Sequence, residues 1–522
     1  MRKALFLGAG LASSLPLLAT FYTASSLSAC SSGGDSDSGA DVDQRPPTPP
    51  EWDRPVTRPD DTTAANGRAA CTYKRGDMPA ETLGASEPVD TAIPIDTVVV
   101  LMMENHSFDN YFGQLGKFLN RTDIESAPAS ATNPGVDPGD GGAPAQYPYT
   151  HAPHKCTLDT NHEWNGSHYE YADGGMSGFV QQNEGWSAGD LPDGGDPSLA
   201  SGARAMYYYD QTDIPFYYAL AQNFAIGDHY HCSVLGPTWV NRMYFWAGTS
   251  FGRTSNEFPD ITSYTYPDND ATILDELEKR HVDWNIYANS LPSAAMIYGV
   301  SFLNRWGRNP QHRVTPYPNT PSDGTEFVNA AKAGTLPPMS FLDPDLIHEN
   351  SDGNDEHPPG DIQTGQKFTS DMLQALMTGP QWPHMAIFIT WDEHGGFYDH
   401  LPPPPACVPD TTAPILSGSN NSIPANFDRL GFRVPLIVVS PYAKKGYVGH
   451  ATYDHTSITK FIEAKFKIPC LTARDANADA PMDLFDFSAP AQLTPPTLPA
   501  ATIDPTELTY CETTYPHGDG GL

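Results

Sequence analysis

The chain has 522 residues, of which 39% are hydrophobic, and its 63 Asp and Glu residues against 29 Lys and Arg residues give a formal net charge of −34. This length is more than one ordinary domain needs. The acidic excess argues against a nucleic-acid partner and against electrostatic attachment to anionic membranes, because both carry the same sign of charge.

The N-terminus has the pattern of an export signal. Arg2 and Lys3 precede an apolar stretch, and small residues follow it, as in a secretory signal peptide. The stretch ends in LSAC at 27–30, which resembles a bacterial lipobox, in which the cysteine is acylated and becomes the mature N-terminus. A plain signal peptide with a chance cysteine is the alternative. Residues 1–30 are therefore expected to direct export to the periplasm or outer cell surface, with a lipid anchor on Cys30.

Residues 31–90 are expected to form a flexible tether, most clearly over 31–68. They are acidic and rich in Pro, and they offer little apolar surface for a core. The folded domain is placed at 91–515, with its first secondary structure near Pro94.

Six cysteines remain after Cys30, and an exported protein meets an oxidising compartment, so up to three disulfides are expected. Their pairing cannot be read from the sequence. The chain has no CxxC motif, which argues against a thiolate zinc site. The six cysteines are Cys71, Cys156, Cys232, Cys407, Cys470 and Cys511.

Three continuous apolar runs, at 96–103, 385–391 and 434–440, predict buried strands. Runs without alternation are typical of parallel strands covered on both faces. Helices are predicted at 271–282, just before a strand WNIY, and at 456–466.

Because strands and helices interleave, the pattern favours an α/β sandwich. Residues 114–215, rich in Gly, Pro, Asp and Tyr, are expected to form long insertions or a cap over the sheet edge.

Oxygen ligands follow two of these strands directly. Glu104 and Asn105 end the first run, and Asp392 and Glu393 end the second. In open α/β sheets, ligands bind beyond the carboxyl ends of the strands. Three carboxylates brought together there require either a protonated member or a divalent cation, and the oxygen set favours a hard cation. Taken singly, each pair also fits an ordinary turn or solvated loop.

A hydroxyl lies at the start of a third predicted element. Gly236 and Pro237 form a turn, and Thr238 begins a helix, where a hydroxyl most often serves as an N-cap. A helix N-terminus also favours a bound anion. A metal-bound Thr238 would be a nucleophile able to attack phosphorus, and Asn241 and Arg242 are candidates to hold phosphate oxygens.

These residues carry a family resemblance. ENHSFDNYFG at 104–113 resembles the ENxSFDxYFG signature of the bacterial and fungal phosphoesterase family, which contains phospholipases C and metal-dependent acid phosphatases. GPTWVNR at 236–242 resembles its GTxPNR segment, which carries the nucleophile, although Val240 stands where the family usually has Pro. Three further segments match in the family's order between residues 94 and 470, and they are WDEHGGFYDH at 391–400, LGFRVPLIVVSPYAKKGYV at 430–448 and YDHTSITKFIE at 453–463.

The resemblance implies a three-layer α/β/α sandwich of the alkaline-phosphatase-like kind, with loop-rich cap insertions and one divalent metal ion. It implies Thr238 as nucleophile and as a metal ligand. The other implied ligands are Glu104, Asn105, Asp392 and Glu393.

Two histidines match weaker segments of the family, where they lie near the phosphate and the leaving group. They are His162 in LDTNHEW and His357 in DEHPPGDIQTGQ. The acidic residues Asp355 and Glu356 before His357 are expected to keep it protonated, as a general acid needs. A surface position is the alternative for each histidine.

The sequence therefore predicts a metal-dependent phosphoric ester hydrolase. Only about 60 Pro-rich residues follow the last motif, whereas longer phospholipase members carry further C-terminal domains, and this favours broad phosphomonoester hydrolysis of the acid-phosphatase type. The alternatives are a phospholipase C that cleaves phosphatidylcholine-type headgroups and a non-catalytic exported binding lipoprotein. A sulfatase is disfavoured because no CxPxR-like sequence is present, and a serine esterase because there is no GxSxG elbow.

Overall fold

The computed structural model describes residues 51–192, 194–257, 272–290, 292–298, 302, 314–316, 326–347 and 353–516. The predicted signal at 1–30 and the first part of the predicted tether lie outside the described residues. In the part of the chain that is described, no helix is both long and apolar enough to cross a membrane.

The described residues build an eight-stranded mixed sheet at the centre of the fold, in the order β12-β6-β11-β10-β1-β9-β7-β8. The strands are β1 Thr97–Met103, β6 Ala225–Gly227, β7 Trp284–Ala288, β8 Val314–Pro316, β9 Met339–Asp343, β10 Met385–Trp391, β11 Leu436–Val439 and β12 Val448–Gly449.

The two longest strands lie side by side and parallel. Every residue of β1 and β10 is buried, as the continuous apolar runs predict. Their register pairs Thr97 with Met385 and Met103 with Trp391. The chain therefore leaves both strands at the same edge of the sheet, and Glu104 and Asp392 are the first residues beyond it.

The third predicted strand runs in the opposite direction to the one expected. β11 pairs antiparallel with β10, Ile387 opposite Val439 and Thr390 opposite Leu436. The carboxyl end of β11 at Ser440 thus lies at the far edge of the sheet, and its beginning lies beside the polar ends of β1 and β10. An apolar run does not encode strand direction, which is set by the connections on either side of it.

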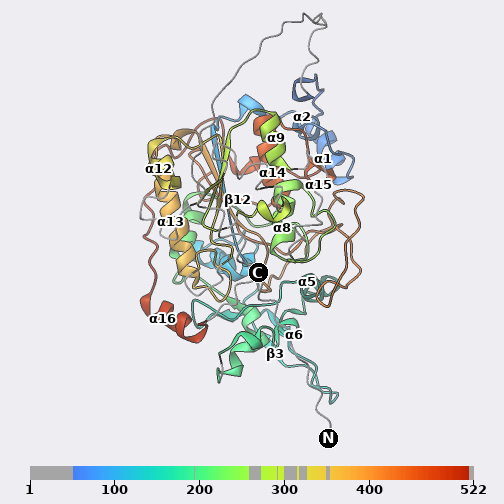
Figure 1. The fold of residues 1–522 in the computed structure, drawn as a ribbon, viewed down its shortest axis with the longest axis vertical. Helices are drawn as coiled ribbons and strands as arrows, with labels where there is room; N and C mark the ends of the chain where they lie inside the picture. The colour runs from blue at the N-terminus through green and yellow to red at the C-terminus, as the bar shows by residue number, and fades with distance from the viewer. Residues whose placement is uncertain are drawn as a thin grey trace, which may run out of the picture. The chain divides into compact units, whose positions relative to one another are not determined.

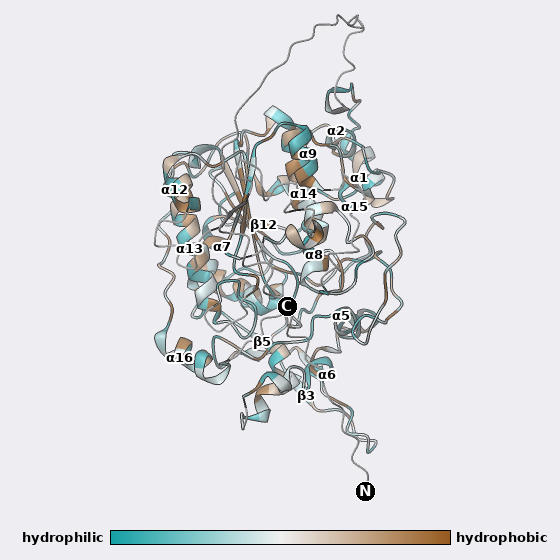
Figure 2. Ribbon diagram, viewed as in Figure 1, coloured by the Kyte–Doolittle hydropathy of each residue, from teal (hydrophilic) through white to brown (hydrophobic). Residues whose placement is uncertain are grey.

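Helices cover both faces of the sheet (Figure 1). On one side lie α12 Glu326–Ala333 and α13 Ile362–Thr378, with α7 Pro215–Asn223 packed against α13. On the other lie α8 Thr238–Ala247, α9 Ile273–Lys279 and α14 His455–Phe466. The strands between them are predominantly apolar in Figure 2. The predicted three-layer α/β/α sandwich is confirmed, and so are the helices expected at 271–282 and 456–466.

Residues 114–215 form short elements and loops at the polar edge of the sheet, as expected for a cap. The side chain of Thr160 donates a hydrogen bond to the carbonyl of Gly395, in the turn that follows β10. The elements of this region are α4 Leu115–Leu119, β2 Thr132–Pro134, β3 Gln146–Pro148, β4 Thr150–His151, α5 Trp164–Tyr171, α6 Phe179–Asn183 and β5 Tyr207–Tyr208.

The predicted tether is too long at its C-terminal end, because residues 51–90 pack against the folded domain. They contain α1 Asp61–Ala69, capped by Asp60, and α2 Pro79–Thr82. Arg68 donates to Asp479, 2.7 Å away, and Cys71 forms a disulfide with Cys407. The polar composition of this segment suggests a flexible tether, because composition carries no information about these long-range partners.

Two of the three possible disulfides form. Besides Cys71–Cys407, the bridge Cys156–Cys511 ties the cap to the C-terminal helix α16 Pro505–Thr514. Cys232 and Cys470 are buried thiols. The short α-helices not yet mentioned are α3 Phe108–Phe112, α10 Ala295–Tyr298 and α15 Ala473–Ala476.

We expect the double substitution Cys71→Ser and Cys407→Ser to lower the free energy of unfolding by about 2–5 kcal/mol, because the bridge restricts the unfolded chain over a sequence separation of 336 residues. Urea unfolding of the full chain measures this. The pair Cys156→Ser and Cys511→Ser is the matched comparison, since that bridge spans 355 residues and should have a similar effect. A stability unchanged by the first pair would contradict the observed packing of residues 51–90.

Candidate active site

The carboxyl ends of β1 and β10 place four polar residues together in the interior. Glu104, Asn105, Asp392 and Glu393 are all buried. The backbone N–H of Asn105 donates to Asp392 Oδ1 at 3.2 Å, and the N–H of Glu393 donates to the same oxygen at 2.8 Å. The two strand ends are thus joined through one carboxylate.

Arg242, on α8, is the cation among these acids. Its Nε donates to Asp392 Oδ2 at 3.0 Å and its Nη2 to Glu104 Oε1 at 3.3 Å, and it also donates to the carbonyls of Met102 and Met103. Burial disfavours its charge, but the two carboxylates outweigh burial and raise the pKa of Arg242. Its guanidinium therefore has partners within the protein on several sides.

The single positive charge of Arg242 does not balance the negative charge of the three carboxylates. Burial, and then the neighbouring charge of Asp392, raise the pKa of Glu104 and of Glu393 well above the usual value. A site of this kind needs either protons on the acids or a further cation.

Two oxygens in this group accept no hydrogen bond within the described residues: Asn105 Oδ1 and Glu393 Oε1. Buried polar atoms are normally paired, so these two fit a hard cation bound through oxygen. Glu104, Asp392 and Glu393 are not, however, among the groups of His, Cys, Asp and Glu whose ligand atoms all lie within 4.8 Å of one another in the described structure. Two of the three acids are bridged by Arg242 in this arrangement.

The turn after Glu393 depends on glycine. Gly395 has a φ of +63°, and a Cβ there would lie 2.1 Å from the carbonyl oxygen of Asn105. Its N–H donates to Glu393 Oε2 at 2.7 Å. The HGG sequence after the acids thus lets the two strand ends approach closely and holds one carboxylate oxygen in place.

Thr238 is the first residue of α8 and is buried. It lies one turn before Arg242, so both residues occupy the same face of the helix. The Asn241 amide holds the preceding turn, because its Oδ1 accepts the N–H of Val234 at 3.0 Å and its Nδ2 donates to Gly236 at 2.7 Å. Asn241 and Arg242, the residues expected to hold phosphate oxygens, both hydrogen-bond to protein atoms in this arrangement.

The two histidines lie together, with ring centroids 5.6 Å apart. The Asn105 amide lies 3.4 Å from His162 Nε2, while His162 Nδ1 donates to the carbonyl of Thr160 at 2.7 Å. Asp159, which the sequence did not single out, completes a group with His162 and His357 whose ligand atoms lie within 4.8 Å. The only feature of the sequence that points to Asp159 is its position three residues before His162.

The two acidic residues before His357 have different surroundings. The carboxylate of Glu356 accepts hydrogen bonds from Tyr111, Tyr217 and Trp391 at 2.6–2.9 Å, and burial raises its pKa to about 8. Glu356 thus anchors the loop through these three side chains. Asp355 instead accepts the backbone N–H of His357.

Two further side chains support the turn after β10 and were not identified from the sequence. His455, at the start of α14, donates through Nε2 to the carbonyl of Asp392 at 2.6 Å. Glu170, on α5, lies 2.7 Å from His394 Nε2. Both come from segments distant in sequence, so only the fold reveals them.

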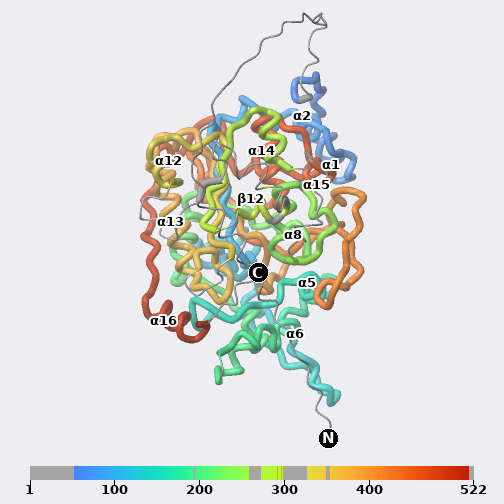
Figure 3. The backbone as a smooth tube through the Cα atoms, viewed as in Figure 1, coloured from blue at the N-terminus to red at the C-terminus, as the bar shows by residue number. Residues whose placement is uncertain are grey.

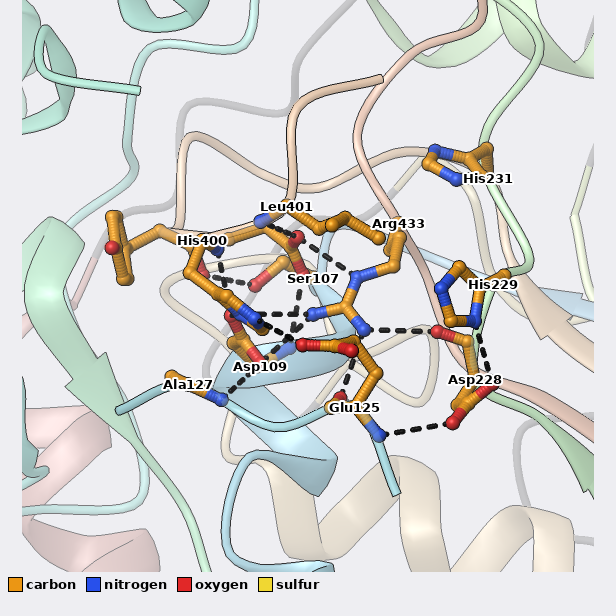
Figure 4. A network of polar contacts seen from close by, with 12 residues as sticks. Ser107, Asp109, Glu125, Ala127, Asp228, His229, His231, His400, Leu401 and Arg433 are labelled. Atoms are coloured by element: carbon orange, nitrogen blue, oxygen red, sulfur yellow. Dashed lines mark hydrogen bonds and ion pairs between the residues drawn. The ribbon is translucent and has the colours of Figure 1, made fainter. Parts of the chain in front are cut away.

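A second buried polar network holds the surrounding segments together (Figure 4). Arg433 donates to Asp399 at 2.9 Å and to Asp109 at 3.0 Å, and His400 donates to Asp109 at 2.6 Å and to Glu125 at 2.9 Å. It joins the segment after β1, the segment after β10 and the segment just before β11.

The comparisons with known proteins agree with the geometry. The Phosphoesterase family pattern matches residues 95–469. Phospholipase C B of Mycobacterium tuberculosis is 30% identical over 440 residues, which cover 77% of this chain and 80% of that protein. Non-specific phospholipase C1 of Arabidopsis thaliana is 31% identical over 433 residues, which cover 78% and 74%.

Among solved structures, a protein in the alkaline phosphatase superfamily from Vibrio parahaemolyticus is similar over 88% of this chain and 96% of that chain, at 10% identity. Its TM-score of 0.37 is too low to carry an argument about function.

We expect the network around Arg433 to make stability depend on pH. Burial lowers the pKa of His400, but Asp109 outweighs it and raises that pKa to about 9. Because the folded pKa is above the unfolded value of about 6.5, the stabilisation by His400 is fully present below that pH and is lost as pH rises through about 9.

Thermal and urea unfolding of wild type and His400→Gln between pH 6 and pH 10 measures this. The stability difference between the two proteins should shrink as the pH rises. His384→Gln, at an exposed histidine, is the control and should show no such trend. A difference that stays constant or grows would contradict the assignment.

Proposed function

The chain belongs to the Phosphoesterase family and is a hydrolase that acts on phosphoric ester bonds, and from that premise we propose that it uses one divalent metal ion and the hydroxyl of Thr238 as nucleophile. The observation that carries the proposal is the buried acid group with two oxygens, on Asn105 and Glu393, that accept no hydrogen bond.

Glu104, Asn105, Asp392 and Glu393, together with Thr238, are the residues proposed to hold the metal. A divalent ion there would supply positive charge that stabilises the developing charge on the phosphoryl oxygens and lowers the pKa of a bound hydroxyl. Three carboxylates against the single charge of Arg242 leave an excess of two negative charges, which a divalent ion balances.

Thr238 Oγ1 is proposed to lose its proton to solvent and to attack phosphorus in line, so that the bond from phosphorus to the leaving oxygen breaks as the phosphoryl group becomes bonded to Thr238. Arg242 and Asn241 are assigned to positioning: one fixes α8 against the acids, and the other fixes the turn before the nucleophile. Water then breaks the bond between Thr238 Oγ1 and phosphorus, which restores the hydroxyl and releases phosphorylcholine from a phosphatidylcholine-type diester or phosphate from a monoester.

His357 is proposed to protonate the leaving oxygen and later to take a proton from the attacking water. Its Nδ1 donates to the carbonyl of Pro358 at 2.5 Å, which leaves proton transfer to Nε2. His162, next to the Asn105 amide, is proposed to contact the phosphoryl group, with the Thr160 carbonyl orienting its ring through Nδ1.

For the substrate we propose a phospholipid diester with a phosphatidylcholine-type headgroup. The support is that the relatives over three quarters of the chain are named phospholipases C. This reverses the order expected from the sequence, which placed phosphomonoesters first.

We expect Thr238→Ala to reduce hydrolysis of p-nitrophenyl phosphorylcholine by at least about a thousandfold, because it removes the attacking oxygen. Chelation with EDTA should abolish the activity and added divalent metal should restore it. Thr249→Ala is the matched control, a buried threonine just after the same helix, and should retain the rate within a few-fold. Thr238→Ser should keep part of the activity.

Parallel assays with p-nitrophenyl phosphate decide the substrate class. Turnover of the monoester alone would replace the phospholipase proposal by a phosphatase. Near wild-type activity of Thr238→Ala would place the nucleophile elsewhere. Absence of turnover on both substrates by the metal-loaded protein would favour the non-catalytic binding lipoprotein.

A further inference from the structure

Residues 408–421 form a loop, here called the rim loop, with unusual exposure of aliphatic side chains. Val408, Ile415 and Leu416 are 46%, 57% and 38% exposed. The described residues contain seven exposed large hydrophobic side chains, so three of the seven fall within nine consecutive positions. Single exposed apolar residues are ordinary on any surface, but several within one short segment are a reason to look for an interaction surface there.

The rim loop is attached to the start of α8. The N–H of Ile415 donates to the carbonyl of Gly252 at 2.7 Å, in the loop that follows α8. The same loop carries Asn256, whose Oδ1 accepts the N–H of Trp239 at 3.0 Å. Trp239 is the neighbour of Thr238, so the exposed aliphatic residues connect through two hydrogen-bonded contacts to the proposed nucleophile.

The other end of the rim loop is attached to α5. Asn165 donates to the carbonyl of Ser419 at 2.7 Å and accepts the N–H of Ser422 at 2.9 Å. α5 begins two residues after His162. The rim loop is the orange tube beside α8 and α5 in Figure 3. It therefore connects α8, which carries Thr238, with α5, which follows His162 in the chain.

The base of the rim loop is fixed covalently and by polar contacts. Cys407, just before it, is bonded to Cys71. Within the loop, Asn421 donates to Thr254 at 3.2 Å. A loop held at both ends in this way loses less conformational freedom when its exposed apolar side chains bind a partner.

The charges on the rim loop and on the whole chain indicate which kind of membrane surface the rim loop can bind. Asp410 is the only Asp, Glu, Lys or Arg between residues 401 and 427, and its carboxylate accepts the Thr249 hydroxyl at 2.7 Å. The chain as a whole carries a net charge of −34. An anionic bilayer would repel it, whereas a zwitterionic bilayer accepts apolar side chains without requiring basic residues.

We propose that the rim loop inserts Val408, Ile415 and Leu416 into the surface of a zwitterionic phospholipid bilayer and so brings lipid headgroups to the site at the start of α8. The inference rests on the proposed phospholipase function for its purpose, but membrane binding by the loop can be measured without any turnover.

The test uses the full chain with Cys30→Ser, so that no acyl anchor attaches. Ile415→Asp and Leu416→Asp are compared with Leu493→Asp, whose side chain is 52% exposed outside the rim loop. Co-sedimentation with phosphatidylcholine vesicles measures binding, and release of phosphorylcholine from the vesicles measures interfacial hydrolysis. Turnover of soluble p-nitrophenyl phosphorylcholine reports the site itself.

We expect both rim-loop variants to lose at least about tenfold in vesicle binding and in vesicle hydrolysis, with soluble turnover unchanged and Leu493→Asp equal to the parent. Phosphatidylglycerol added to the vesicles should weaken binding. Equal vesicle binding by all proteins would overturn the proposal, and so would a parallel loss of soluble turnover. If the parent binds vesicles through the loop but hydrolyses no diester, the surface stands and the proposed function fails.

Discussion

Three buried carboxylates face a single guanidinium where β1 and β10 end, and this imbalance is the constraint on which the rest of the site depends. Glu104, Asp392 and Glu393 have lost their hydration, and Arg242 compensates only part of their charge. Isolated buried charge is costly, and it persists in a folded protein when it is paired, protonated or bound to a cation. A divalent ion removes the imbalance and at the same time supplies what phosphoryl transfer requires.

The fold concentrates these acids at one place. Parallel pairing brings the ends of β1 and β10 to one edge, and α8 delivers Arg242 between them from the layer that covers the sheet. Around this group, the Arg433 network and the anchor at Glu356 fix the segments that leave the strands. These buried polar groups hold the segments of the site in position, as preorganised electrostatic catalysis demands.

Much of the site's framework could be predicted from the sequence, because its signals are local. Continuous apolar runs located β1 and β10, and the Gly-Pro turn located the start of α8 at Thr238. The residues after each strand followed from the rule that ligands collect at carboxyl ends of strands.

Features that depend on distant partners could not be predicted in the same way. The direction of β11 and the packing of residues 51–90 are fixed by contacts far away in sequence. The partners of Arg242 and the pairing of Cys71 with Cys407 are also set by contacts between residues far apart in the sequence. The sequence shows Arg242 as a charged residue within a polar motif, which suggests a contact with substrate. Only the structure shows that Asp392 and Glu104 are its counterions.

The most direct test of the metal assignment is the stability of Glu393→Gln relative to wild type, with and without divalent metal. We predict that the order of stability of the two proteins reverses when metal is added. In EDTA the substitution removes a carboxyl group whose charged form is disfavoured by burial and by Asp392, so the variant should unfold at an equal or higher temperature than wild type. In saturating metal the wild type alone should gain the full stabilisation of a bound ion, about 2.7 kcal/mol at a hundredfold excess over Kd, and become the more stable protein. An equal metal-induced shift in both proteins, or none in either, would contradict a metal bound by these acids.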